Sequence, residues 1–241
     1  MSGQDEHNAV TLQPLGHIRS CFMDKFGIPR QPGLCRHATG HVVLQPPFDD
    51  PDAFRGLEDF SHVWLTFLFH QTPPSPFRPL IRPPRLGGNR RQGVFASRSP
   101  FRPNRLGLSL VRHEGLFREK GRLCLGLRGL DLVTGTPILD IKPHLPWCDA
   151  PADAHAGWAE APPQPLAVDF SPGARQQLAH WQSRYPQLEA LIRDLLGQDP
   201  RPAYKKAAED PRIYGIRLYD IDVHWQVVQG RVQVQNLADV P

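Results

Sequence analysis

Residues 60–71 read F-S-H-V-W-L-T-F-L-F-H-Q, an almost continuously apolar run rich in β-branched and aromatic side chains. Such a run predicts a central β-strand that is buried on both faces. The predicted strand ends at His70 and Gln71, two polar residues at the mouth of a buried element. Polar side chains in this position are compatible with either a structural role or a ligand site.

The segment that follows is dominated by arginine. No Asp or Glu occurs from residue 60 to residue 113, so salt bridges within the segment cannot account for its cations. Frequent Pro and Gly predict loops joined to short strands, one of them at residues 93–99. A solvated basic surface is one interpretation. Because guanidinium groups match phosphate oxygens and base edges, we favour a site for anions or nucleic acid.

Short segments of alternating apolar and polar residues flank these two stretches. They lie at residues 9–20, 41–46, 108–118, 121–133 and 137–142, and turn residues separate them. The pattern predicts a mainly β fold, in which residues 9–146 form a barrel or strongly curved sheets.

The composition changes after residue 146. Residues 147–167 are rich in small residues, acids and prolines and predict a linker or covering arm. Residues 168–241 predict a small α+β domain. Its first helix starts at Ser171 and Pro172, a second helix ends at Gly197, and an antiparallel hairpin turns at Gly230.

Composition and charge exclude several classes of protein. The 241 residues carry a net charge of only +4, and no apolar run approaches the ~20 residues that span a bilayer. The polar, acidic amino terminus is unlike an export signal, and the four cysteines form no C-x-x-C pair. We therefore expect a cytoplasmic protein without membrane contact, disulfides or a bound metal.

The motifs of common catalytic sites are also missing. The sequence contains no dinucleotide fingerprint, phosphate-binding loop, H-E-x-x-H helix or G-x-S-x-G elbow. Asp131 and Asp140 could act as a carboxylate pair, although either could equally satisfy backbone amides of a turn or strand. The residues alone thus predict a β-rich protein with an arginine-lined site for a polyanion.

Six segments in order resemble the TrmO (TsaA/YaeB-like) tRNA methyltransferases. They are F-G-I-P-R-Q-P-G-L (26–34), R-G-L-E-D-F-S-H-V-W-L-T-F-L-F-H-Q (55–71), R-P-P-R-L-G-G-N (82–89), G-V-F-A-S-R-S-P-F-R-P-N (93–104), L-D-L-V-T-G-T-P-I-L-D-I-K-P (130–143) and D-P-R-P-A-Y (199–204). The resemblance runs from about Pro14 to the carboxy-terminal hairpin. It implies a β-barrel methyltransferase domain, unlike the Rossmann type, with a small second domain and a homodimeric assembly.

The resemblance also implies an activity. S-adenosylmethionine (SAM) would methylate N6 of threonylcarbamoyl-adenosine beside the anticodon of threonine tRNA. The SAM-binding residues implied in this chain are Pro29, Arg30, Gln31, His70, Gln71, Arg98, Leu106, Asp131, Leu132, Val133 and Thr134. Among them, Leu106 and Val133 could enclose an adenine, and Gln31 could hold an amino-acid carboxylate.

Three residues are candidates for the group that assists proton removal from N6: His70, Asp131 and Asp140. The anticodon arm of the tRNA would be held by a larger basic set. It comprises Arg78, Arg82, Arg85, Arg90, Arg91, Arg102, Arg105, Lys205 and Lys206. Arg98 and Arg102 could also stabilise a developing anion or the threonyl carboxylate.

The chain departs from the family pattern at Arg105, where a proline is usual, and at Thr134, where an aspartate is common. Two alternative functions stay open on the sequence alone. One is an RNA-binding protein that has lost SAM, which the change at Thr134 would fit. The other is an enzyme that uses the same arginines on a small anionic metabolite.

Overall fold

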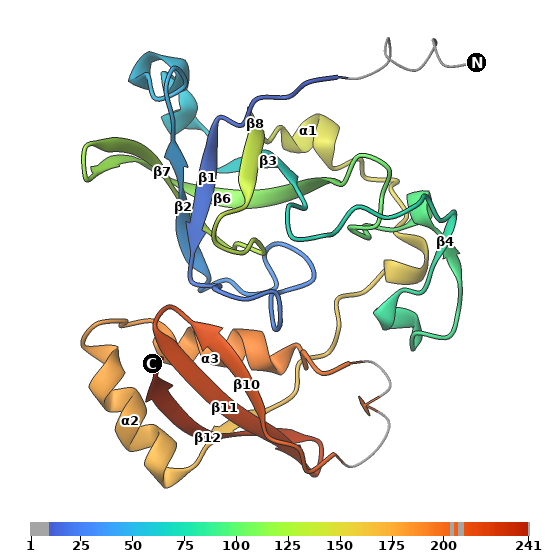
Figure 1. Cartoon of the computed structure of the whole chain (residues 1–241), viewed down its shortest axis with the longest axis vertical. Coiled ribbons are helices and arrows are strands. Elements are labelled where there is room, and N and C mark those ends of the chain that lie inside the picture. The colour runs from blue at the N-terminus through green and yellow to red at the C-terminus, as the bar shows by residue number, and fades with distance from the viewer. Residues whose placement is uncertain (1–9, 203–204, 207–209, 241) are drawn as a thin grey trace.

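A computed structural model describes residues 10–202, 205–206 and 210–240 of the chain (Figure 1). The first part is a closed barrel with the strand order β1-β2-β7-β6-β3-β8, which confirms the predicted barrel. Its strands are β1 (Gly16–Ser20), β2 (Thr39–Leu44), β3 (His62–Leu68), β6 (Leu106–Glu119), β7 (Arg122–Arg128) and β8 (Pro137–Pro143). Residue 9, where we placed the start of this part, lies outside the described residues.

Strand β3 is the apolar segment at residues 60–71. It pairs with β6 on one side and β8 on the other, so its central position is confirmed. The prediction of burial on both faces is wrong. Val63, Leu65 and Phe67 are buried in the barrel, whereas the alternate residues are only half-buried. A barrel has one packed interior, so its strands bury one face fully, whatever the hydrophobicity of the other.

Strands β6 and β7 form a long hairpin, which confirms the two strands predicted at residues 108–118 and 121–133, although β7 ends at Arg128. The 14 residues of β6 continue past an irregularity between His113 and Leu116. Gly115 lies there with φ of +85°, a conformation that glycine adopts without steric cost. The bulge lets one strand serve both as a barrel wall and as a projecting hairpin.

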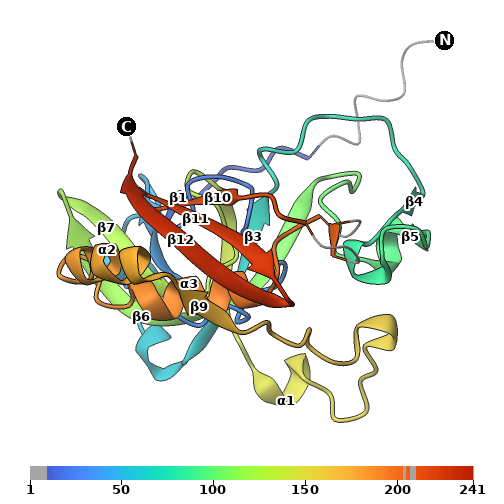
Figure 2. The same cartoon turned by 90° about the horizontal axis from the view of Figure 1, so that it is seen from below.

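The arginine-rich segment forms an arm beside the barrel, which we call the arginine arm (residues 75–105; Figures 1 and 2). It contains a minimal two-stranded ribbon, β4 (Leu80–Ile81) with β5 (Gln92–Gly93). The strand predicted at residues 93–99 is wrong, because residues Val94–Ala96 form a 3-10 turn. The Ser97 hydroxyl donates to the Val94 carbonyl oxygen at 2.8 Å and closes this turn.

Other short helical segments lie in the loops and in residues 147–167. They are the 3-10 turns Pro51–Phe54, Leu57–Asp59, Pro84–Leu86 and Gly157–Ala159, and the single-turn helix α1 (Pro146–Asp149). Residues 147–167 are otherwise irregular up to β9. The boundaries that we placed at residues 146 and 167 stay a prediction.

The carboxy-terminal part has a four-stranded sheet in the order β10-β11-β12-β9 and two helices, as the α+β prediction required. Its elements are β9 (Val168–Phe170), α2 (Pro172–Gln182), α3 (Leu188–Gly197), β10 (Tyr214–Leu218), β11 (Ile221–Val228) and β12 (Arg231–Asp239). Ser171 caps α2, since its hydroxyl oxygen accepts from the backbone N–H of Ala174 at 3.1 Å. Strands β11 and β12 meet across Gly230. Among the described residues, no helix has the length and apolar character to cross a membrane.

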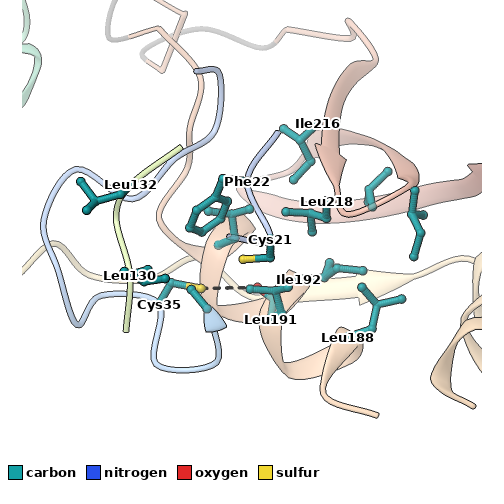
Figure 3. Close-up of a cluster of buried hydrophobic side chains, with 14 of the residues drawn as sticks. Cys21, Phe22, Cys35, Leu130, Leu132, Leu188, Leu191, Ile192, Ile216 and Leu218 are labelled. Carbon is teal, nitrogen blue, oxygen red and sulfur yellow. Dashed lines mark hydrogen bonds between the residues drawn. The ribbon is translucent and has the colours of Figure 1, made fainter. Parts of the chain in front are cut away.

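A continuous apolar core joins the two parts (Figure 3). Cys21, Phe22 and Cys35 of the first part pack among Leu191 of α3 and Leu218 of β10. The backbone is joined as well. Phe22 pairs with Leu218 as an isolated bridge, and the N–H of Tyr219 donates to the carbonyl oxygen of Cys21 at 2.9 Å. Because buried side chains interlock at this junction, residues 198–202 and 205–206 hold a fixed place beside the barrel.

Candidate active site

One large cleft of about 1970 Å³ lies between the barrel and the arginine arm. Its walls come from the loop at residues 25–34, the end of β3, the arm, the start of β6 and the loop before β8. Residues from the carboxy-terminal part, including Gln198 and Lys206, complete the lining. Small-molecule pockets usually measure roughly 300–1,000 Å³, so this cleft has room for a cofactor and a second ligand together.

Most residues implied in SAM binding line this cleft. They are Pro29, Arg30, Gln31, His70, Gln71, Arg98, Leu106, Asp131, Leu132 and Val133. Separate segments of the chain supply them, and the barrel closes these segments around one space. Their individual roles stay predictions.

Thr134 has a different position from its neighbours in the turn. Its hydroxyl oxygen accepts from the N–H of Ser20 at 3.1 Å and can donate to the Ser20 carbonyl oxygen at 3.1 Å. Its own N–H donates to the Phe22 carbonyl oxygen at 2.9 Å. The side chain therefore fastens the loop at residues 131–136 to the end of β1. The hydroxyl performs this structural task without a carboxylate, so Thr134 gives no support to the loss of SAM.

Asp131 is a half-buried carboxylate at the wall of the cleft. Its Oδ1 atom accepts a hydrogen bond of 2.6 Å from the hydroxyl of Ser109, which is fully buried on β6. Burial raises the pKa of Asp131 to about 6, and this outweighs the Ser109 hydrogen bond and the charge of Arg98, which lower the pKa. A carboxylate with this pKa can exchange a proton near neutral pH.

Arg98 is held in place by Gln31. Its Nη1 atom donates to Oε1 of Gln31 at 2.5 Å, which joins the arm to the loop at residues 25–34. The hydrogen bond fixes a cation close enough to Asp131 to lower the pKa of that carboxylate. The arrangement places a positive charge and a carboxyl group whose pKa is about 6 on the same cleft wall.

His70 lies at the end of β3, as the sequence indicated. Burial lowers its pKa, and the nearby charges of His17 and Lys25 lower the pKa further. The Lys25 ammonium donates to the carbonyl oxygen of Gln71 at 2.7 Å. His70 is therefore mostly neutral at pH 7 and could accept a proton, so it stays a candidate beside Asp131.

Asp140 is not brought to the cleft. Its carboxylate forms an ion pair with Lys142 on the same strand, and its Oδ1 atom accepts from the N–H of Ile141 at 3.0 Å. The structure thus separates Asp140 from Asp131 and gives no support to a carboxylate pair. Its catalytic role stays an untested prediction.

The basic residues proposed for tRNA divide into two groups. Those that line the cleft are Arg78, Arg82, Arg85, Arg91, Arg102 and Lys206, whereas Arg90, Arg105 and Lys205 do not line it. Arg105 instead donates to the Thr72 carbonyl oxygen at 2.9 Å, and Lys205 lies 3.8 Å from the Asp210 carboxylate. In the part of the chain that the structure describes, no arginine from 78 to 105 forms an ion pair.

Two residues of the site carried no clear sequence signal. Ser109 resembles any polar residue in an alternating strand, yet it is the donor that faces Asp131. Trp158, in the segment at residues 147–167, lines the cleft although its surroundings are typical of a linker. Only the three-dimensional pairing of distant segments reveals these roles. The last two residues of the D-P-R-P-A-Y motif, at positions 203 and 204, lie outside the described residues.

A group of potential metal ligands lies at the junction of β2, β6 and β7. The ligand atoms of His41, Glu119 and Cys124 lie within 4.8 Å of one another, away from the cleft. Arg19 already forms an ion pair with Glu119 at 2.9 Å, and burial raises the pKa of the Cys124 thiol. A neutral thiol and a paired carboxylate are poor ligands, so this group does not suggest a metal centre.

The lining residues fit the cofactor that the resemblance implies. Leu106, Leu132 and Val133 offer apolar surface for an adenine ring, and the latter two are nearly fully buried. Gln31 and Asp131 offer polar groups suited to the ribose and the charged amino-acid end of SAM. This combination of apolar walls and a few fixed polar groups is typical of cofactor pockets.

The raised pKa of Asp131 predicts that replacing its carboxylate by an uncharged group stabilises the protein at a pH above that pKa. The folded protein binds this proton more tightly than the unfolded chain, so stability falls as pH rises from about 4 to about 6. A shift of about two units corresponds to about 3 kcal/mol. Asp131→Asn should therefore unfold at higher denaturant concentration than the native protein at pH 7.5, with the advantage lost at pH 4.

The exposed control Asp153→Asn should not gain stability in this way. An Asp131→Asn variant that is less stable than the native protein at pH 7.5 would contradict the assignment.

Comparison with known proteins agrees with this architecture. Residues 17–150 match the tRNA-methyltransferase O N-terminal domain, and residues 163–240 match the TrmO C-terminal domain. The tRNA (adenine(37)-N6)-methyltransferase of Escherichia coli (strain K12) is 48% identical over 228 residues, covering 94% of this chain and 97% of the relative. The enzyme of the same name from Eikenella corrodens is 45% identical over 182 residues, covering 75% of this chain and 98% of the relative.

A solved structure gives the same result for the fold. The crystal structure of TrmO from Pseudomonas aeruginosa superposes with a TM-score of 0.79 at 46% identity, covering 95% of this chain and 98% of that one. Domain matches over most of the chain, close relatives and a shared fold all agree. The chain belongs to the TrmO family of SAM-dependent tRNA (adenine37-N6)-methyltransferases.

Proposed function

We propose that this methyltransferase acts on threonylcarbamoyl-adenosine at position 37 of threonine tRNA and methylates its N6 atom. Family membership gives the coarser activity, SAM-dependent methylation of a tRNA adenine at N6. The observation that carries the finer proposal is Asp131, a half-buried carboxylate with a pKa of about 6 in a cleft lined by arginines. The chemistry of the proposed substrate needs both features.

The threonylcarbamoyl group changes what the enzyme must do at N6. Its carbonyl withdraws electrons from N6, so the nitrogen is a poor nucleophile, but its proton becomes more acidic. SAM supplies an electrophilic methyl group when bound. The protein must then remove the N6 proton and hold the reactants in line. Asp131 is the group we assign to proton removal, because its pKa lies close to the working pH.

The threonyl carboxylate adds a negative charge that the arginines can recognise. Arg98, bonded to Gln31, lies near Asp131, and Arg102 lines the same cleft, where its guanidinium donates to the Ser97 carbonyl oxygen at 2.8 Å. Each arginine keeps further N–H donors for a ligand. The remaining cations of the cleft suit phosphates of the anticodon arm.

Nucleoside mass spectrometry tests the substrate directly. Threonine tRNA that carries the threonylcarbamoyl group should gain one methyl group after treatment with the protein and SAM. The same tRNA lacking this group should gain methyl groups at least ~10-fold more slowly, since the acidic N6 proton and the carboxylate are both missing. Equal rates on the two tRNAs would show that the proposed substrate is wrong while leaving tRNA methylation itself intact.

The pH profile of the reaction tests the role of Asp131. As a base it must be deprotonated, so kcat/KM should rise with pH and level off above an apparent pKa of about 6. Ser109→Ala removes the hydrogen bond that favours the charged form, and this should move the rise upward by about one pH unit. Ser183→Ala, at the end of α2, serves as the control. If the rise stays in place in Ser109→Ala but moves in a His70 variant, His70 is the base.

A homodimer is the assembly that we propose. Its support is the projecting β6–β7 hairpin, where Leu116 and Phe117 are exposed apolar side chains. Sedimentation velocity should therefore give the mass of two chains, and Leu116→Asp should shift the protein toward one chain, whereas the control Trp147→Asp should not. A single-chain mass for the native protein at micromolar concentration would contradict the proposal.

A cytoplasmic location, which suits a tRNA enzyme, also stays a prediction.

A further inference from the structure

Two phenylalanine side chains stand exposed on the arginine arm. Phe77 is 58% and Phe95 72% exposed, and their rings stack on each other with centroids 6.3 Å apart and planes 28° apart. Neither ring belongs to the apolar core. A pair of large apolar rings in contact with water is unfavourable, and such surfaces commonly mark places of interaction.

The backbone presents these rings in a fixed arrangement. Phe77 and Phe95 flank the β4–β5 ribbon, in which Leu80 pairs with Gly93. The N–H of Val94 donates to the Pro79 carbonyl oxygen at 2.9 Å, which extends the pairing toward the rings. The 3-10 turn Val94–Ala96 then directs Phe95 outward. The rings are therefore held by hydrogen-bonded backbone and not by burial, so the faces that do not contact the other ring stay available.

The surroundings of the pair are strongly cationic. Arg78, Arg82 and Arg91 are exposed, line the cleft with Phe95, and form no ion pair in the described part of the chain. No carboxylate occurs anywhere from residue 60 to residue 113. Proteins that bind single-stranded nucleic acid combine a cationic surface for the backbone with aromatic rings on which bases stack. A protein partner that bound the two rings through apolar contacts alone would leave these arginines without anionic partners.

We infer that Phe77 and Phe95 form a stacking platform for an unpaired base of the tRNA loop, next to the adenine that is methylated. The target base must leave the stack of its loop to enter the cleft, so a neighbouring base loses a stacking partner. The platform replaces that partner at the edge of the same cleft. The inference depends on the tRNA methyltransferase activity of the family and not on the threonylcarbamoyl group or on the choice of threonine tRNA.

Binding of an anticodon stem-loop RNA, measured by fluorescence anisotropy, tests the platform. Phe77→Ala and Phe95→Ala should each weaken binding by about 5- to 150-fold, the range that the loss of one base–aromatic stack produces. Phe95→Tyr should bind as the native protein does, whereas Phe95→Leu should bind like the alanine variant. The control is Trp147→Ala, because Trp147 is 82% exposed and does not line the cleft.

Two further measurements separate stacking from other roles. The slope of log Kd against log salt should be unchanged in the Phe variants, since no phosphate contact is lost. SAM binding by calorimetry should also match the native protein. With 2-aminopurine placed in turn at each unpaired loop position, one position should show quenching that Phe95→Ala abolishes and Trp147→Ala retains.

Other outcomes would overturn the inference. If Phe77→Ala and Phe95→Ala bind the stem-loop with native affinity, the rings do not contact RNA. If these variants instead change the sedimentation coefficient, with RNA affinity per chain unaltered, the pair belongs to a contact between two copies of this chain. Because both rings are exposed, the substitutions should leave thermal unfolding unchanged, and this comparison confirms that the variants are folded.

Discussion

The packed junction between the barrel and the carboxy-terminal part determines the geometry of the whole molecule. Cys21, Phe22 and Cys35 are buried against α3 and β10, so neither part presents a complete surface without the other. This junction places Gln198 and Lys206 in the same cleft as the arm that carries the arginines. The cleft between them is thus a consequence of core packing, although most of its walls are loops and short turns beside the ends of β3 and β6.

The site places one energetically unfavourable group in this framework. Asp131 would be more stable in water, as its raised pKa shows, and Ser109 compensates only part of the cost of burial. The protein tolerates such a group at the cleft wall because the hydrogen-bonded strands of the barrel supply stability elsewhere. Thr134 holds the loop of Asp131 against β1, so the orientation of the carboxylate depends on a residue that does not line the cleft.

The sequence predicted the parts of this protein that depend on local pattern. Alternation in the strands gave the barrel, Ser171 and Pro172 gave the start of α2, and the quoted motifs gave the family and the residues around the cleft. It did not predict contacts between distant segments. Ser109 lies 22 residues from Asp131, and strand order alone brings them together. The strand predicted through Phe95 was wrong because local apolar character does not distinguish a buried strand from a turn that exposes its ring.

The absence of carboxylates from the arginine arm has an energetic consequence for the free protein. Its guanidinium groups repel one another, and backbone and side-chain hydrogen bonds, together with the buried side chain of Val94, hold the arm in shape against that repulsion. A bound polyanion removes the repulsion and so lowers the energy of the folded arm as well as forming contacts. In the tRNA complex that we propose, the bound RNA therefore relieves the charge repulsion within the arm, and this relief contributes to the affinity.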